Sequence, residues 1–110
     1  MTGKVLTPVA TVTLKTGDTT LTDASAGDGP VDAIFTAVDR ITGITGQLVD
    51  YRIDAVTRGR EALGEVHIVV RFGDKEVSGR GASPDVLEAS ALAYVQTVNR
   101  FVALDRKSVV

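Results

Sequence analysis

Alternating apolar and polar positions open the chain. Residues 5–15, VLTPVATVTLK, predict a strand that ends at the turn signal TGD. The apolar side chains of one face of this strand are Ala10, Val12 and Leu14. Pro8 cannot donate a hydrogen bond to a neighbouring strand, which places the segment at a sheet edge. Residues 19–25, TTLTDAS, predict a second, short strand.

The period then changes to that of a helix. Apolar side chains recur on one helical face at Val31, Ile34, Phe35, Val38 and Ile41. Pro30 suits the first helical position, because its missing N–H costs nothing there. We expect the helix to end by Gly43 or Gly46.

Alternation returns in the second half of the chain. Residues 48–57, LVDYRIDAVT, predict a half-buried strand, with Val49, Tyr51, Ile53 and Ala55 on the inner side. Residues 65–72, EVHIVVRF, give the clearest strand. The letters GDK signal a hairpin turn, and residues 76–79, EVSG, predict a short returning strand.

A long second helix follows the segment GRGASP, residues 79–84, which we expect to be a loop. Ser83 is the expected N-cap and Pro84 the first helical residue. The expected buried stripe is Leu87, Ala91, Val95, Val98 and Phe101 or Val102.

Both helical segments run Gly-x-Gly, then Pro, then a helix closing in AVDRI or TVNRF. This self-similarity predicts an α+β fold of two pseudo-symmetric strand-strand-helix halves, with helices packed on antiparallel sheets.

Composition narrows the class of protein. The 110 residues suit a single domain, and no apolar run approaches the length of a membrane span. The 12 basic residues are scattered among 14 acidic ones, which favours a mixed, solvated surface over a nucleic-acid patch. With no Cys and no signal pattern, we expect a cytoplasmic protein.

The candidate chemistry is binding without catalysis. A helix start offers free N–H groups to a carboxylate or phosphate, but no GKS or GKT follows the glycines and Asp28 would repel phosphate. His67 is the only histidine, which leaves it as a solvent-facing or cross-strand residue rather than a metal ligand or base. The serines lack a base, so no catalytic residue, metal or cofactor is expected. Tyr94 is expected in core or interface packing. Tyr51, beside Ala55, is open between core packing and the wall of an aliphatic pocket.

Three linked motifs carry a family resemblance: GDGPVDAIFTAV, LVDYRIDAVTRGREALGEVHIVV and GRGASPDVLEASALAYVQTVNRF. Together they resemble the C-terminal regulatory domain of 2-isopropylmalate synthase, and citramalate synthase carries the same kind of domain. The match covers about residues 8–104. The resemblance implies a homodimer that binds an end-product amino acid, leucine for the first enzyme, at the dimer interface and inhibits a distant catalytic barrel.

The resemblance also implies which residues bind the ligand. The first loop and helix turn would hold the charged end of the amino acid: Gly27, Asp28, Gly29, Pro30, Val31, Asp32 and Ala33. The strand after it would supply walls and carbonyl groups at Leu48, Tyr51 and Ala55. The second loop would supply an equivalent helix start at Gly79, Gly81, Ala82 and Pro84.

The expected organisation is a single amino-acid-binding regulatory domain over residues 1–110, without the catalytic barrel and therefore without the parent acyltransferase activity. Its expected partners are leucine or a related branched-chain amino acid, a second copy, and a catalytic barrel domain or subunit, with no nucleic acid and no membrane. The alternatives are a citramalate synthase domain that binds isoleucine and a structural dimerisation domain with no ligand. An RNA-binding domain is disfavoured, because Pro84, Asp85 and Glu88 stand where such a module places lysines.

Overall fold

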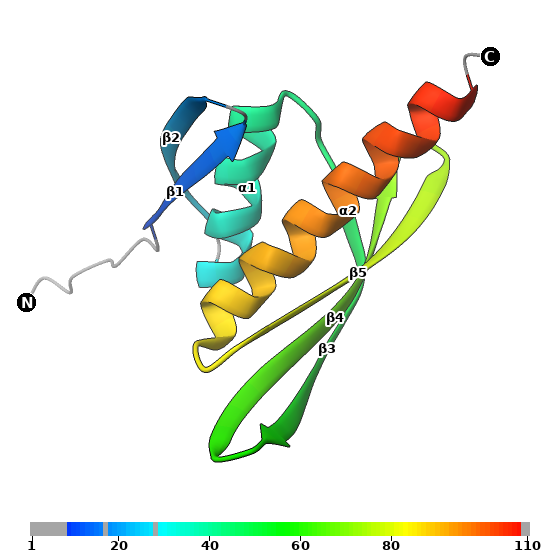
Figure 1. Cartoon of the computed structure of the whole chain (residues 1–110). Coiled ribbons are helices and arrows are strands. Elements are labelled where there is room, and N and C mark those ends of the chain that lie inside the picture. The colour runs from blue at the N-terminus through cyan, green and yellow to red at the C-terminus, as the bar shows by residue number, and fades with distance from the viewer. Residues whose placement is uncertain (1–8, 17, 28, 109–110) are drawn as a thin grey trace, which may run out of the picture. The chain divides into compact units, whose positions relative to one another are not determined.

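The computed structural model describes residues 9–16, 18–27 and 29–108. Within them the elements are β1 (Val9–Thr16), β2 (Thr19–Ala26), α1 (Pro30–Thr42), β3 (Gln47–Arg58), β4 (Glu61–Phe72), β5 (Lys75–Ser83) and α2 (Val86–Ser108). The chain forms two compact units: the first ends at Gly43 and the second begins at Ile44. Each unit joins antiparallel strands to one helix, which confirms the predicted α+β class (Figure 1).

The first unit is a two-stranded hairpin covered by α1. β1 and β2 pair from Val9 with Ala26 to Thr16 with Thr19, so both predicted strands are confirmed. The predicted inner side chains, Ala10, Val12 and Leu14, are half-buried. The predicted strand residues 5–8 lie outside the described residues.

α1 begins and ends at the residues that the sequence indicates. Pro30 occupies its first turn, and Gly43 ends it with a φ of 72° and an N–H that donates to the Asp39 carbonyl at 2.8 Å. The buried residues of its inner face are Ala33, Ile34, Phe35, Ala37 and Val38. This face packs against β1 and β2.

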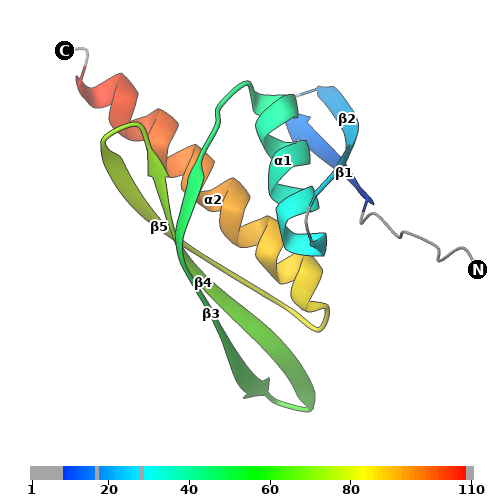
Figure 2. The same ribbon diagram turned by 180° about the vertical axis from the view of Figure 1, so that it is seen from behind.

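The second unit is an antiparallel sheet in the order β3-β4-β5, and both views show α2 running along it (Figures 1 and 2). β4 is the central strand, and its side chains form much of the core of the unit. Its inward side chains, Val66, Ile68, Val70 and Phe72, are all buried, as the alternation predicts. α2 contacts β4 and β5, whereas β3 forms one edge of the sheet.

The expected loop before the second helix was wrong over residues 79–83. These residues belong to β5, and α2 begins at Val86 rather than at Pro84. The residue before a proline favours extended backbone, so Ser83 stays in the strand. Asp85 is the N-cap instead: its Oδ1 accepts from the Leu87 N–H at 2.8 Å.

The predicted buried stripe of α2 was also partly wrong. Val98 is buried, but Leu87 is 41% exposed. Tyr94 is fully buried, as expected, and the other fully buried residues of α2 are small or polar: Ala89, Ser90, Ala93 and Thr97. At Gly79 and Gly81 of β5 the helix backbone approaches the strand closely, which is why the alanines Ala93 and Ala89 face them.

Neither of the helices in the described part of the chain is long and apolar enough to cross a membrane.

Candidate functional site

The N-cap residue of α1 provides no side-chain hydrogen bond to the helix start. Its N-cap residue is Gly29, which has no side chain that accepts a hydrogen bond, and Pro30 has no N–H to donate. The Ala33 N–H bonds to the Gly29 carbonyl at 2.9 Å, which closes the first turn of the helix. The N–H of Val31 has no acceptor inside the helix, and the helix dipole makes this end positive. A carboxylate is stabilised by such an arrangement.

The chain before α1 folds tightly onto the first helical turn. A Cβ at Gly27 would lie 2.5 Å from both the backbone nitrogen of Ala33 and the Oδ2 of Asp32, so only glycine fits there. At Gly29 a Cβ would meet nothing within 4 Å. The predicted residues Gly27, Gly29 and Ala33 therefore surround one helix start, with open space at the cap. Asp28 lies outside the described residues.

Asp32 changes the electrostatics of this helix start. It is an exposed acidic residue in the first turn of α1. A carboxylate here interacts favourably with the helix dipole and reduces the positive potential that a bound anion would meet. The predicted set thus includes a group that competes with an anionic ligand.

The predicted wall residues Leu48, Tyr51 and Ala55 share one face of β3. A bulge after Leu48 shifts the register, so that Leu48 pairs with Val70 and Tyr51 with Ile68. Both partners are buried on the side of the sheet that α2 covers. Leu48 therefore joins the inner face that simple alternation assigned to Val49.

The prediction that β3 is half-buried was wrong for most of the strand. Val49 and Ile53 are 45% and 49% exposed, and Ala55 is exposed as well. Only Tyr51 and Val56 are half-buried. The cause is the edge position of β3, because α2 lies over the other two strands.

Tyr51 is held by a hydrogen bond to α2. Its hydroxyl lies 2.6 Å from the Oγ of Ser90, which is fully buried. The Ser90 hydroxyl already donates to the Val86 carbonyl at 2.8 Å, and a serine has a single O–H to donate. Tyr51 is therefore the donor to Ser90, and its phenol oxygen keeps its acceptor lone pairs.

The second set of predicted residues occupies different structure from the first. Gly79, Gly81 and Ala82 lie in β5, and Pro84 lies between β5 and α2. A Cβ at Gly79 would lie 2.5 Å from the Ala93 carbonyl oxygen, so this glycine serves close packing against α2. The ligand-binding role of these residues stays a prediction.

The two helix starts also differ in their caps. α2 carries its own carboxylate cap, Asp85, whereas Gly29 leaves the start of α1 uncapped. An internal carboxylate satisfies the same N–H groups that a ligand would use. The sequence repeat of the two helical segments does not extend to this feature.

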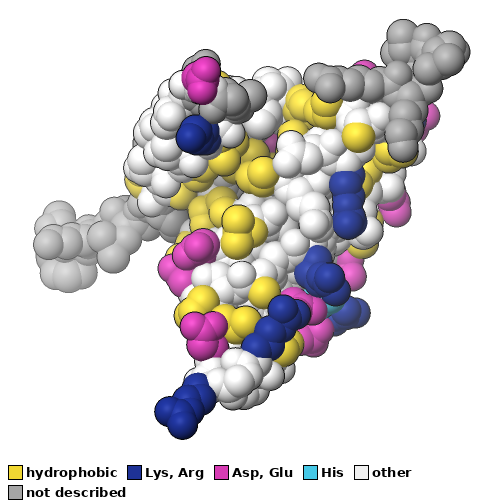
Figure 3. Space-filling model, viewed as in Figure 1, with side chains coloured by type: hydrophobic (Ala, Val, Ile, Leu, Met, Phe, Trp, Pro, Cys, Tyr) yellow, Lys and Arg dark blue, Asp and Glu magenta, His cyan; other side chains and the backbone are white. Residues whose placement is uncertain are grey.

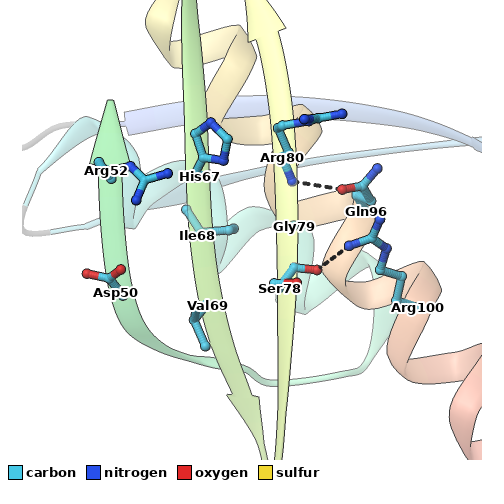
Figure 4. A pocket seen from close by; sticks show the side chains of 10 residues that line it. All are labelled: Asp50, Arg52, His67, Ile68, Val69, Ser78, Gly79, Arg80, Gln96 and Arg100. Carbon is cyan, nitrogen blue, oxygen red and sulfur yellow. Dashed lines mark hydrogen bonds between the residues drawn. The ribbon is translucent and has the colours of Figure 1, made fainter. Parts of the chain in front are cut away.

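A cleft of about 490 Å³ lies on the other face of the second unit's sheet (Figure 4). Its charged and polar lining includes Asp50, Arg52, His67, Arg80, Gln96 and Arg100. Alternation predicts the sheet residues of this polar face. It does not reveal Gln96 and Arg100, because these reach the cleft from α2 around the edge of β5 (Figure 4).

His67 takes part in an ion-pair cluster on this face. Its Nε2 lies 2.7 Å from Glu65 and 3.5 Å from Asp54, and Arg52 lies 3.5 Å from Asp54. The prediction of a cross-strand residue is confirmed, since Arg52 and His67 pair directly. Across the described residues no group of three His, Cys, Asp or Glu side chains is arranged to hold a metal ion.

Acidic and basic side chains are interspersed on the face of the second unit that Figure 3 shows. This matches the mixed surface expected from the composition and from a net charge of −2.

Antiparallel strands covered by one helix in each of two units define a small α+β domain. Residues 1–102 match the family model of the LeuA allosteric (dimerisation) domain. The chain belongs to this family.

The similar proteins found in a sequence comparison carry the name 2-isopropylmalate synthase. The protein from Methylacidiphilum infernorum is 51% identical over 94 residues, which cover 84% of this chain and 19% of that protein. The one from Carboxydothermus hydrogenoformans is 50% identical over 102 residues, 92% of this chain and 20% of its own length. The chain thus spans about a fifth of the length of these curated relatives.

Proposed function

We propose that the chain is the regulatory domain of a 2-isopropylmalate synthase and binds leucine as a feedback inhibitor at a dimer interface. The family description, allosteric and dimerising, and the names of the relatives support this assignment. The parent enzyme would be a cytoplasmic acyltransferase of leucine biosynthesis, with its catalytic part in the portion of the relatives that this chain does not span.

The observation that carries the ligand proposal is the uncapped start of α1. Gly29 supplies no side-chain acceptor, and the space beside it is open. The carboxylate of an amino acid would accept from the first-turn N–H groups, as a capping side chain does in other helices. The charge of the ligand would replace the missing cap.

The face of β3, in the second unit, carries two groups that would suit an aliphatic amino acid. The Tyr51 hydroxyl donates its hydrogen bond to Ser90. Its oxygen can therefore accept a hydrogen bond from an ammonium group. Ala55 lies exposed on the same face, and its small side chain leaves room for an aliphatic group. These two residues are proposed independently of the start of α1.

Two alternatives predict different ligands. A citramalate synthase domain would prefer isoleucine, and a purely structural dimerisation domain would bind neither amino acid. Titration calorimetry of the chain with leucine, isoleucine and valine separates the three. Saturable heat that is strongest for leucine supports the proposal, and no heat from a demonstrably dimeric sample contradicts it.

A substitution at the cap tests the role of α1. Gly29→Ser fits, because a Cβ there meets nothing within 4 Å and the φ of −151° suits any residue. Its hydroxyl would accept the N–H groups that we assign to the ligand carboxylate. We expect unchanged or slightly higher stability, by a few tenths of a kcal/mol, together with leucine binding weakened about tenfold.

The matched control is Ala103→Ser, which adds the same hydroxyl to an exposed position of α2. It should leave leucine binding unchanged. Equal affinity for leucine in the wild-type chain and in Gly29→Ser would remove α1 from the binding site, even if the chain binds leucine.

A further inference from the structure

The edge of β5 is covered by two side chains from α2. The backbone N–H of Arg80 donates to Gln96 Oε1 at 2.7 Å, and Arg100 Nη1 donates to the Ser78 carbonyl at 2.8 Å. Figure 4 shows Arg80, Gln96 and Arg100 along this edge of the cleft. The bond to Ser78 fixes the Arg100 guanidinium while leaving its other N–H groups available.

The positive charges at this edge are not neutralised locally. Among the described residues, neither Arg80 nor Arg100 has a carboxylate within ion-pair distance. The acidic residues near Arg52 and His67 are already paired with them. Asp50 lines the same cleft, but it lies on β3, two strands from Ser78. Strands are about 4.8 Å apart, so about 10 Å separates Asp50 from this edge.

Two guanidinium groups beside a cleft suit a small oxyanion. Guanidinium donors match the oxygen spacing of phosphate and carboxylate groups, and charge-assisted bonds to them are the strong ones. We propose that the cleft on the outer face of the second unit binds a phosphate or carboxylate group of a small molecule between Arg80 and Arg100. This site uses neither the start of α1 nor Tyr51 or Ala55, and it does not depend on the leucine proposal.

The test is an NMR titration of the ¹⁵N-labelled chain with sodium phosphate at constant ionic strength, set by sodium chloride. We expect saturable shifts at the backbone amides of Ser78 to Arg80 and at the Arg100 side chain. A parallel titration with acetate separates the two sources of the oxyanion. Tighter binding of phosphate indicates a phosphate-bearing ligand, and tighter binding of acetate indicates a carboxylate; both outcomes support the site.

The decisive variant is Arg80→Gln, because within the described residues Arg80 bonds to the fold through its backbone and not its side chain. We expect the apparent Kd for the tighter anion to rise about tenfold, the loss of one charge-assisted contact, while leucine binding stays unchanged. Arg60→Gln is the matched control: it removes the same charge from an exposed turn outside the cleft. Shifts that do not saturate, or an equal loss in Arg60→Gln, would overturn the proposal, since either result indicates general charge attraction.

Discussion

Tyr51 is the residue whose surroundings say most about its role. Its ring is half-buried on an edge strand, and its hydroxyl reaches a fully buried serine on α2. The hydrogen bond ties the exposed strand to the helix and fixes the ring on its inner face. Tyr51 is the donor in this bond, because the Ser90 hydroxyl donates to the Val86 carbonyl.

The Tyr51–Ser90 bond should be measurable as a coupling energy. Tyr51→Phe and Ser90→Ala should each lower the free energy of unfolding by about 1 kcal/mol. In the double variant we expect a coupling of about 1 kcal/mol rather than an additive loss. Urea unfolding followed by Tyr94 fluorescence reports on this unit in all variants, since both tyrosines of the chain lie in it. Additive losses would mean that the contact contributes nothing to stability.

At the residue scale, the sequence predicted local backbone features better than it predicted contacts between distant residues. Gly43 and Pro30 were assigned correctly because helix ends depend on local backbone chemistry. The bulge after Leu48 was not predictable, because it depends on pairing with β4 rather than on β3 itself. The hydrogen bond between Tyr51 and Ser90 joins residues 39 positions apart, and no local sequence pattern reveals it.

The elements of the second unit are shaped by the glycines of β5. Gly79 and Gly81 are buried and face Ala93 and Ala89 of α2. The helix backbone comes so close that an added Cβ would meet main-chain carbonyl oxygens. Gly-x-Gly before a proline is typical of a loop, and this local signal produced the wrong prediction for residues 79–83. The glycines instead let a helix lie against a strand.

Close packing at β5 predicts a large loss from a small change. Gly81→Ala places a methyl group against the Ala89 carbonyl and the Ala93 nitrogen, neither of which can move without shifting the helix. We expect the free energy of unfolding to fall by about 2 kcal/mol or more. Urea unfolding of the second unit measures this change.

Gly64→Ala is the matched control for Gly81→Ala. It adds the same methyl group to β4, where the nearest obstacle, at 2.8 Å, is a methyl of the Val86 side chain. A side chain can change rotamer, so the loss should be smaller by at least about 1 kcal/mol. Equal losses in the two variants would show that helix approach is not what requires glycine at position 81.

At the scale of the whole molecule, one edge of the three-stranded sheet is covered by side chains and the other is open. Gln96 and Arg100 occupy hydrogen-bonding groups at the edge of β5. The described residues give β3 no neighbour on its outer side, and its large apolar residues Leu48, Val49 and Ile53 are 40–49% exposed. An open edge with exposed apolar side chains is a surface for association. In a family described as dimerising, we expect β3 to take part in the contact between two copies.

This expectation is tested by placing a charge on β3. Ile53→Lys should raise the dimer Kd by at least about tenfold, because a lysine is costly to bury in an apolar contact. The strand tolerates the change in the single chain, since Ile53 is already 49% exposed. Leu104→Lys is the control: that residue is 45% exposed but lies near the end of α2. Sedimentation velocity across a concentration series measures both variants. If the dimer Kd of Ile53→Lys equals that of Leu104→Lys, the surface around Ile53 is not part of the interface. The exposed apolar side chains of α2, Leu87 and Leu92, would then be the next candidates for the dimer contact.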